Sequence, residues 1–204
     1  MGYRQAVRHG PLTPAFVGSN PTTPANMNDK IIVFLAESKA HIDSAFHICQ
    51  EKLGKNYITI SEFENFAIKK NLLIATINEK VVGFLFFEMT TEQMFYKSIK
   101  IIKNSNIPVL VLKTIAVKDI KKGIGTALVN YCINNFLNNA KKIFTPVWKS
   151  KFGINALKLI QKFGFKEIET IKNYWYKDSL NKENYCPVCN SPCVCDLVVF
   201  CKII

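Results

Sequence analysis

The sequence is poor in arginine, histidine and long apolar runs. Arginine occurs only at Arg4 and Arg8, and histidine occurs three times in 204 residues. No apolar run reaches the roughly 20 residues that a membrane-spanning helix needs. The first residues contain no compact apolar run flanked by positive charge, so no secretory signal is predicted. With 49% hydrophobic and 21% charged residues, we expect a globular, cytoplasmic chain without a membrane partner.

Lysine carries almost all of the positive charge, and the formal net charge is +12. Such a balance favours anionic partners, whether nucleic acid, a membrane surface or a phosphorylated small molecule. A lysine-rich solvated surface explains the same excess. The aromatic residues do not alternate with lysines in a recognisable RNA-binding pattern, which argues against nucleic acid as the partner.

Residues 1–26 differ in composition from the rest of the chain. They contain both arginines, four of the eight prolines and no acidic residue. Residues 18–21, Gly-Ser-Asn-Pro, can be encoded by GGT TCG AAT CCT, which contains the T-loop sequence of a transfer RNA gene. We interpret 1–26 as a translated tRNA gene, with Met27 as the true start. A disordered leader rich in proline and threonine is the alternative.

Hydrophobic periodicity divides the remainder into alternating strands and helices, with residues 27–180 as one domain and 181–204 as a cysteine-rich end. Strands are predicted at 31–35, 72–77, 81–88, 109–117, 142–148, 165–176 and 197–204. Helices are predicted at 42–53, from a capping box at Ser61, from the glycines to about 140, and at 155–163. Residues 90–106 fit a loop or an irregular helix. This order predicts an α/β (α+β) fold, a mixed sheet with helices on both faces.

One turn has the composition of a phosphate site. Lys121-Lys122-Gly123-Ile124-Gly125-Thr126-Ala127 joins a predicted strand to a predicted helix. The first turn of a helix leaves backbone N–H groups without partners, and the helix dipole adds positive charge there. Glycines allow a phosphate to approach those groups. The spacing matches neither a Walker motif nor a Rossmann fingerprint, so the turn is a candidate pyrophosphate site of another kind.

Three segments resemble the GNAT superfamily of acyl-CoA-dependent N-acetyltransferases, in the order that the family has them. Residues 114–117 with 122–128 are similar to the signature strand, phosphate turn and helix of that family. Residues 155–165, ending in Lys-Phe-Gly-Phe, are similar to its second motif, and 81–84 fit its strand hairpin. The resemblance runs from 31 to about 176. It implies a central mixed, mostly antiparallel sheet of about six to seven strands flanked by helices.

The resemblance also implies an activity: direct transfer of an acetyl or other acyl group from CoA to an amine. The diphosphate would lie on the amides of the glycine turn. The pantetheine arm would pair with the strand edge at 115–117, where that strand separates from 143–148. A backbone N–H near Val117 would polarise the thioester carbonyl. The cofactor positions implied are Ile115, Ala116, Val117, Lys122, Gly123, Ile124, Gly125, Thr126, Ala127 and Asn155.

Two positions depart from the family pattern. Ile120 stands where the family often has arginine or glutamine, and Ile160 stands where it often has a tyrosine acid. Tyr174 and Tyr176 are candidate replacements for that acid, although cross-strand packing explains them as well. Glu88, at the end of the hairpin, is a candidate base, with an ordinary solvated strand end as the plainer interpretation.

The cysteines gather at the end of the chain. Cys186, Cys189, Cys193 and Cys195 form two close pairs separated by three residues. Four thiolates can hold one tetrahedral zinc ion as a structural knuckle. Reduced thiols packed in a turn are the alternative, because the spacing is tighter than in common zinc ribbons. Cys201 is predicted to be a small core residue in the last strand.

Two classes of function follow from these observations. The first is an N-acyltransferase that uses acetyl-CoA or another acyl-CoA, with a small-molecule amine as acceptor or, second, a protein amine. The acceptor pocket would use residues 54–62 and 90–107. The second class is a catalytically degenerate GNAT-like module that binds nucleic acid, protein or acyl-CoA without transfer. The sequence leaves the oligomeric state open, with a homodimer as one option.

Overall fold

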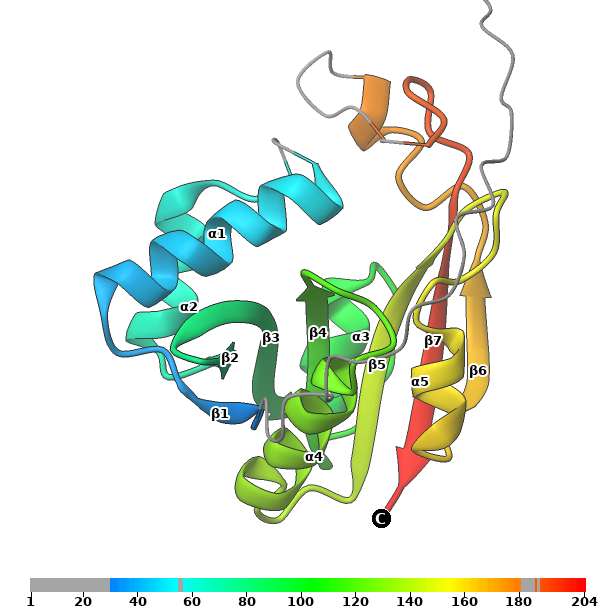
Figure 1. Ribbon diagram of the computed structural model, residues 1–204. Coiled ribbons are helices and arrows are strands. Elements are labelled where there is room, and N and C mark those ends of the chain that lie inside the picture. The colour runs from blue at the N-terminus through cyan, green and yellow to red at the C-terminus, as the bar shows by residue number, and fades with distance from the viewer. Residues whose placement is uncertain (1–29, 55–56, 181–185, 187) are drawn as a thin grey trace, which may run out of the picture.

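The computed structural model describes residues 30–54, 57–180, 186 and 188–204. These residues form a seven-stranded sheet with helices packed on it (Figure 1). The strand order is β1-β2-β3-β4-β5-β7-β6. Of the neighbouring pairs, β4 and β5 alone run parallel. The predicted mixed, mostly antiparallel sheet is therefore confirmed. The segment 1–26, which we interpret as a translated tRNA gene, lies outside the described residues.

The elements of the described chain alternate as the periodicity predicted. The strands are β1 (Ile32–Leu35), β2 (Leu72–Ile77), β3 (Lys80–Thr91), β4 (Pro108–Val117), β5 (Lys142–Lys149), β6 (Lys166–Ile171) and β7 (Asp196–Ile203). The α-helices are α1 (Lys39–Leu53), α2 (Ile60–Ile68), α3 (Glu92–Ser98), α4 (Ile124–Phe136) and α5 (Leu157–Lys162), and a 3-10 turn, η1, covers Asp178–Leu180.

Local capping explains where the first two helices begin. Ser38 caps α1 by accepting a hydrogen bond from the His41 N–H at 3.2 Å. The capping box of α2 is formed by Thr59 and Glu62, so the prediction that Ser61 caps this helix was wrong. The sequence contains both Ser/Thr-x-x-Glu patterns. In the structure, the Glu64 carboxylate accepts from Lys39 Nζ at 3.2 Å and does not fold back as a capping residue would.

Helices cover both faces of the sheet. On one face, α4 and α5 pack on a core that contains Leu85, Leu110 and Phe200; these two helices lie in front in Figure 1. On the other face, α1 and α2 cover β2 and β3 through an aromatic group centred on Phe63. α3 covers β4, β5 and β7, with Phe95 stacked on β5. None of the described helices is both long and apolar enough to cross a membrane.

The second half of the chain departs from the predicted boundaries. α4 ends at Phe136, four residues before the predicted end, and α5 begins two residues late. β6 ends at Ile171, whereas the prediction continued it to residue 176. Asn173 adopts a positive φ of 50°, and its N–H donates to the Asp196 carboxylate at 3.2 Å. This contact turns the chain away from the sheet.

Candidate functional site: an open strand edge beside a helix N-terminus

β4 and β5 begin as neighbours and then separate. Their parallel register ends with Val111 opposite Phe144. The N–H of Lys118, just after β4, donates to Val82 O on the β3 side at 2.7 Å. Because N–H groups along a strand alternate between its two edges, those of Ile115 and Val117 point to the side from which β5 has departed. The separation expected at 115–117 is therefore present, and it leaves an open edge with backbone donors.

The glycine turn lies directly after this open edge. Gly123 is the N-cap of α4 in the left-handed conformation, with φ of 79°. The first helical bond runs from the Ala127 N–H to Gly123 O at 2.9 Å. The N–H groups of residues 124–126 precede that bond, and no side chain caps them. These donors and the positive end of the helix dipole are suited to an anion.

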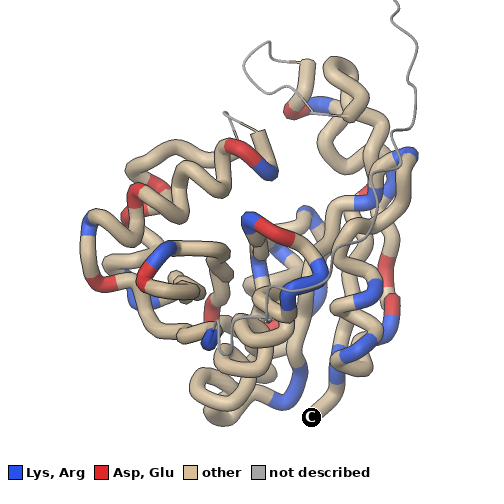
Figure 2. The backbone as a smooth tube through the Cα atoms, in the orientation of Figure 1, with Lys and Arg blue, Asp and Glu red and all other residues tan. Residues whose placement is uncertain are grey.

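The charges beside this turn are mixed. Figure 2 shows basic and acidic positions along the segment between β4 and α4. Lys122 Nζ lies 3.0 Å from the Asp119 carboxylate, so its charge is partly neutralised. Lys121 has no ion pair with any acid in the described part of the chain. Of the two lysines that precede Gly123, Lys121 is therefore the one available to an incoming anion.

Two glycines allow the turn to approach its neighbours. A Cβ at Gly83 would lie 3.0 Å from both Ala116 O and the Ile124 side chain, so β3 approaches β4 and α4 closely at this position. A Cβ at Gly125 would lie 3.2 Å from the tip of Leu159. Gly125 thus faces α5, and its lack of a side chain lets α4 and α5 pack closely. A side chain at Gly83 would push on the backbone of the open edge, whereas one at Gly125 would require the tip of Leu159 to shift by a few tenths of an ångström.

A polar group that the sequence did not reveal lies on the opposite face of the sheet. The Tyr57 hydroxyl forms a 2.7 Å hydrogen bond with Thr114 Oγ1. The preceding residue, Lys113, is skipped in the β3–β4 register, and its ammonium donates to the Glu88 carboxylate at 2.8 Å. Glu88 lies within β3, not at its end as predicted. This bulge brings a phenol, a carboxylate and an ammonium next to the strand that leads into the open edge.

The other candidate residues lie at different places. Asn155 is exposed in the turn that precedes α5, and Ile160 is buried in the core. Tyr174 and Tyr176 lie in turns after β6, not on a strand, and line a hollow of about 530 Å³ beside the end of α3. The Tyr174 hydroxyl donates to Ser98 O at 3.5 Å. Burial and the Asp178 carboxylate raise the pKa of Tyr174 above its ordinary value.

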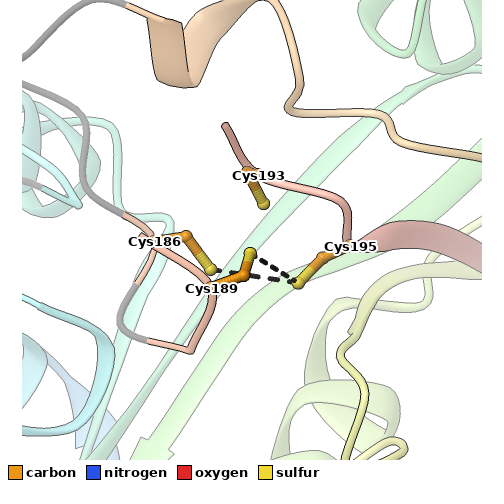
Figure 3. A group of neighbouring side chains, drawn as sticks. All are labelled: Cys186, Cys189, Cys193 and Cys195. Atoms are coloured by element: carbon orange, nitrogen blue, oxygen red, sulfur yellow. Dashed lines mark hydrogen bonds between the residues drawn. The ribbon is translucent and has the colours of Figure 1, made fainter. Parts of the chain in front are cut away.

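The four clustered cysteines come together in the connection between β6 and β7 (Figure 3). Their sulfur atoms all lie within 4.8 Å of one another. Cys195 Sγ is 3.9 Å from that of Cys186 and 3.6 Å from that of Cys189. Cys201 lies apart, in β7, where it packs against the α3 core. The convergence of Cys186, Cys189, Cys193 and Cys195 was predicted from their spacing.

Comparison with known proteins places this geometry in a fold family. No family profile matches the chain, and no curated protein matches it. Solved structures do match. One is Arabidopsis thaliana NAA60 in complex with a bisubstrate analogue, with a TM-score of 0.64 and 13% identity over 86% of this chain and 98% of that one. The chain has the GNAT fold.

Other GNAT structures agree. The NatC complex bound to Gag peptide and CoA matches with a TM-score of 0.63 and 14% identity, over 86% of this chain and 99% of that one. An N-acetyltransferase from Staphylococcus aureus Mu50 matches with a TM-score of 0.59 and 17% identity, over 85% and 98%. At these identities the likeness is one of fold. The likeness covers 85–86% of this chain in these three structures.

Proposed function

We propose that this chain is an N-acyltransferase that moves an acetyl or other acyl group from CoA to an amine. The observation that carries the proposal is the open edge of β4 directly before the uncapped N-terminus of α4. An extended amide-containing arm fits the first, and a diphosphate fits the second. CoA has both, joined in that order. The likeness to GNAT structures that contain CoA or acetyl-CoA supports the same assignment.

The donor would be held mainly by backbone groups. The N–H groups of residues 124–126 would receive the diphosphate, with Lys121 adding positive charge. The N–H groups of Ile115 and Val117 would face the arm and the thioester, and one of them would polarise the thioester carbonyl. Asn155, exposed before α5, would contact the arm. Because backbone donors do this work, isoleucine at position 120 is compatible with binding.

Transfer would be direct. A neutral amine attacks the thioester carbonyl, the C–N bond forms, the C–S bond breaks, and the thiolate leaves as CoA after it takes up a proton. Ile160 cannot supply that proton. The groups beside β4 that can exchange protons are the Tyr57 hydroxyl and the Glu88 carboxylate, with Tyr174 and Tyr176 as further candidates. We propose Glu88, once released from Lys113, as the base that receives the amine proton.

The acceptor that we propose first is a small-molecule amine, and a protein amine is second. The α1–α2 loop, which contains Tyr57, and α3 flank the face of the sheet that presents Glu88, so these segments would select the acceptor. All seven cysteines are free of disulfides in the structure. That pattern supports a reducing compartment such as the cytoplasm for the activity.

The test is a product assay by mass spectrometry. The full chain is incubated with acetyl-CoA and three acceptor classes: polyamines, amino sugars, and peptides with free N-termini. Mass spectrometry is preferred to a thiol reagent because the seven cysteines would react with the latter. The expected result is an acetylated product in one class, formed with an equal amount of free CoA.

Two other results would reject the proposal. Saturable acetyl-CoA binding without product in any class would identify an acyl-CoA sensor. Ile160 would fit that outcome, because it cannot supply the proton that the leaving thiolate needs. Binding of mixed nucleic acid that weakens steeply with salt, without acetyl-CoA binding, would identify a degenerate binding module. Each outcome is read from a different signal.

A further inference from the structure

The cysteine cluster has the dimensions of a metal site. Two thiols come from one turn, Cys186 and Cys189, and two from the segment that enters β7, Cys193 and Cys195. A tetrahedral zinc ion with Zn–S bonds of about 2.3 Å separates its sulfur ligands by about 3.8 Å. The separations of Cys195 Sγ from the sulfur atoms of Cys186 and Cys189, 3.9 and 3.6 Å, bracket that value, and all four sulfur atoms lie within 4.8 Å of one another. A disulfide would need about 2.0 Å.

We propose that Cys186, Cys189, Cys193 and Cys195 bind one zinc ion as a structural tetrathiolate site. Soft thiolate ligands in a tetrahedral arrangement select zinc or iron. Four protein ligands leave no position for a water molecule, so the ion would not take part in catalysis. The proposal goes beyond the acyltransferase function and does not depend on it.

Hydrogen bonds already hold the two ligand turns in place. The Asn190 N–H donates to Cys186 O at 2.9 Å and closes the first turn. The buried Ser179 hydroxyl accepts from the Cys193 N–H at 2.6 Å, and the Ser191 hydroxyl donates to Ser179 O at 2.5 Å. The segment that joins the two cysteine pairs is therefore tied to η1. Such outer contacts orient metal ligands and reduce the ordering that metal binding requires.

The metal site would hold in place the part of β5 that has separated from β4, across from the open edge. The cluster packs against Trp148 on β5 and Trp175 after β6, and the Tyr174 N–H donates to Cys195 O at 3.1 Å. β5 has lost β4 as a neighbour over this stretch and retains β7, with Trp148 opposite Leu197. A metal at the start of β7 would therefore fix the separated end of β5. Figure 1 shows this connection at the end of the sheet to which β4 and β5 both point.

The decisive measurement is metal content by inductively coupled plasma mass spectrometry. The full chain, purified without chelator and reconstituted with zinc, is compared with Cys189→Ser and with Cys201→Ser. Cys189 is partly exposed, so its replacement is the least disruptive in the cluster, and Cys201 is a matched control outside it. The proposal expects one zinc per chain in the wild type and in Cys201→Ser, and loss of the ion in Cys189→Ser.

Tryptophan fluorescence gives a readout that does not require a variant to fold. The sequence has two tryptophans, and both contact the cluster. Chelation of the wild type should change the emission, and added zinc should restore it. Cobalt in place of zinc should give the absorption of a tetrahedral thiolate complex. Stoichiometric iron, two disulfides by mass, or a reduced, folded chain that takes up no zinc would each overturn the proposal. Acetyl-CoA binding, measured on the same samples, separates this result from that of the proposed function.

Discussion

A charge reversal at Lys121 tests the anion site most sharply without touching a packed residue. Lys121 is exposed, has a positive φ of 65° and lies two positions before Gly123, the N-cap of α4. Lysine and glutamate carry similar strain at such a φ, so Lys121→Glu should preserve the turn. It should weaken the binding of acetyl-CoA because it places a negative charge near the proposed diphosphate site. The assay is isothermal titration calorimetry on the full chain.

The magnitude follows from Coulomb's law. At about 7 Å in water, two unit charges interact by about 0.6 kcal/mol. Lys121→Glu changes the local charge by two units, and a diphosphate carries roughly two negative charges, so the unscreened interaction energy changes by about four times that value. Screening at physiological salt leaves about 40% of this energy. The binding free energy should weaken by about 1 kcal/mol, which is about fivefold in Kd. Raising the salt concentration should shrink the difference.

Lys166→Glu is the matched control, because it makes the same charge change far from the turn. Lys166 lies opposite Cys201, which lies opposite Phe144, which lies opposite Val111. Lys166 is therefore three strands away from β4, and along the strand direction it is level with Val111, six positions before Val117. These offsets place it about 24 Å from Val117, which is about three Debye lengths at physiological salt. Equal Kd values for Lys121→Glu and the control would refute the assignment of the anion site.

Three further predictions concern stability and catalysis. Gly123→Ala should lower the free energy of unfolding in urea by about 1–2 kcal/mol, because alanine is strained at a φ of 79°; an unchanged value would show that the turn relaxes. Burial alone would raise the pKa of Glu92, but hydrogen bonds from Ser105 and Lys142 outweigh it and hold that pKa below its ordinary value. Glu92→Gln should therefore cost about 1–3 kcal/mol at neutral pH, and the difference from the wild type should fade as the pH falls through the lowered pKa of Glu92; a constant difference would contradict the pairing. Tyr57→Phe should lower kcat by roughly tenfold or more and leave the Kd of acetyl-CoA unchanged, and a change confined to that Kd would remove Tyr57 from proton transfer.

The fold was predictable where local signals and long-range contacts agree. Asn78 and Glu79 both have positive φ, as a two-residue hairpin turn requires, and β2 and β3 flank them where alternation placed the strands. The strand, glycine turn and helix around Gly123 were equally predictable. A positive φ favours glycine, and a glycine at the N-cap leaves the helix without a side-chain cap, so both features can be read from the sequence. These segments contain most of what identifies the fold.

Other features depend on contacts that no local pattern encodes. Thr59 rather than Ser61 caps α2, and Glu64, the partner that Ser61 would need, pairs instead with Lys39 of another helix. The position of β7 between β5 and β6 is set by pairing between residues that lie 26 to 35 positions apart for β6 and 47 to 61 positions apart for β5. The contact between Tyr57 and Thr114 joins residues 57 apart in the sequence. A lone tyrosine in a loop has no signal that sequence reasoning could use.

The central claim is that the acyl donor occupies the open edge of β4 and the N-terminus of α4. Hydrogen–deuterium exchange of the full chain, with and without acetyl-CoA, tests that location directly. The account predicts slower exchange at the N–H groups of Ile115 and Val117 and of residues 124–126, with β6 unchanged. Protection confined to the hollow beside Tyr174, or no protection at saturating acetyl-CoA, would contradict it.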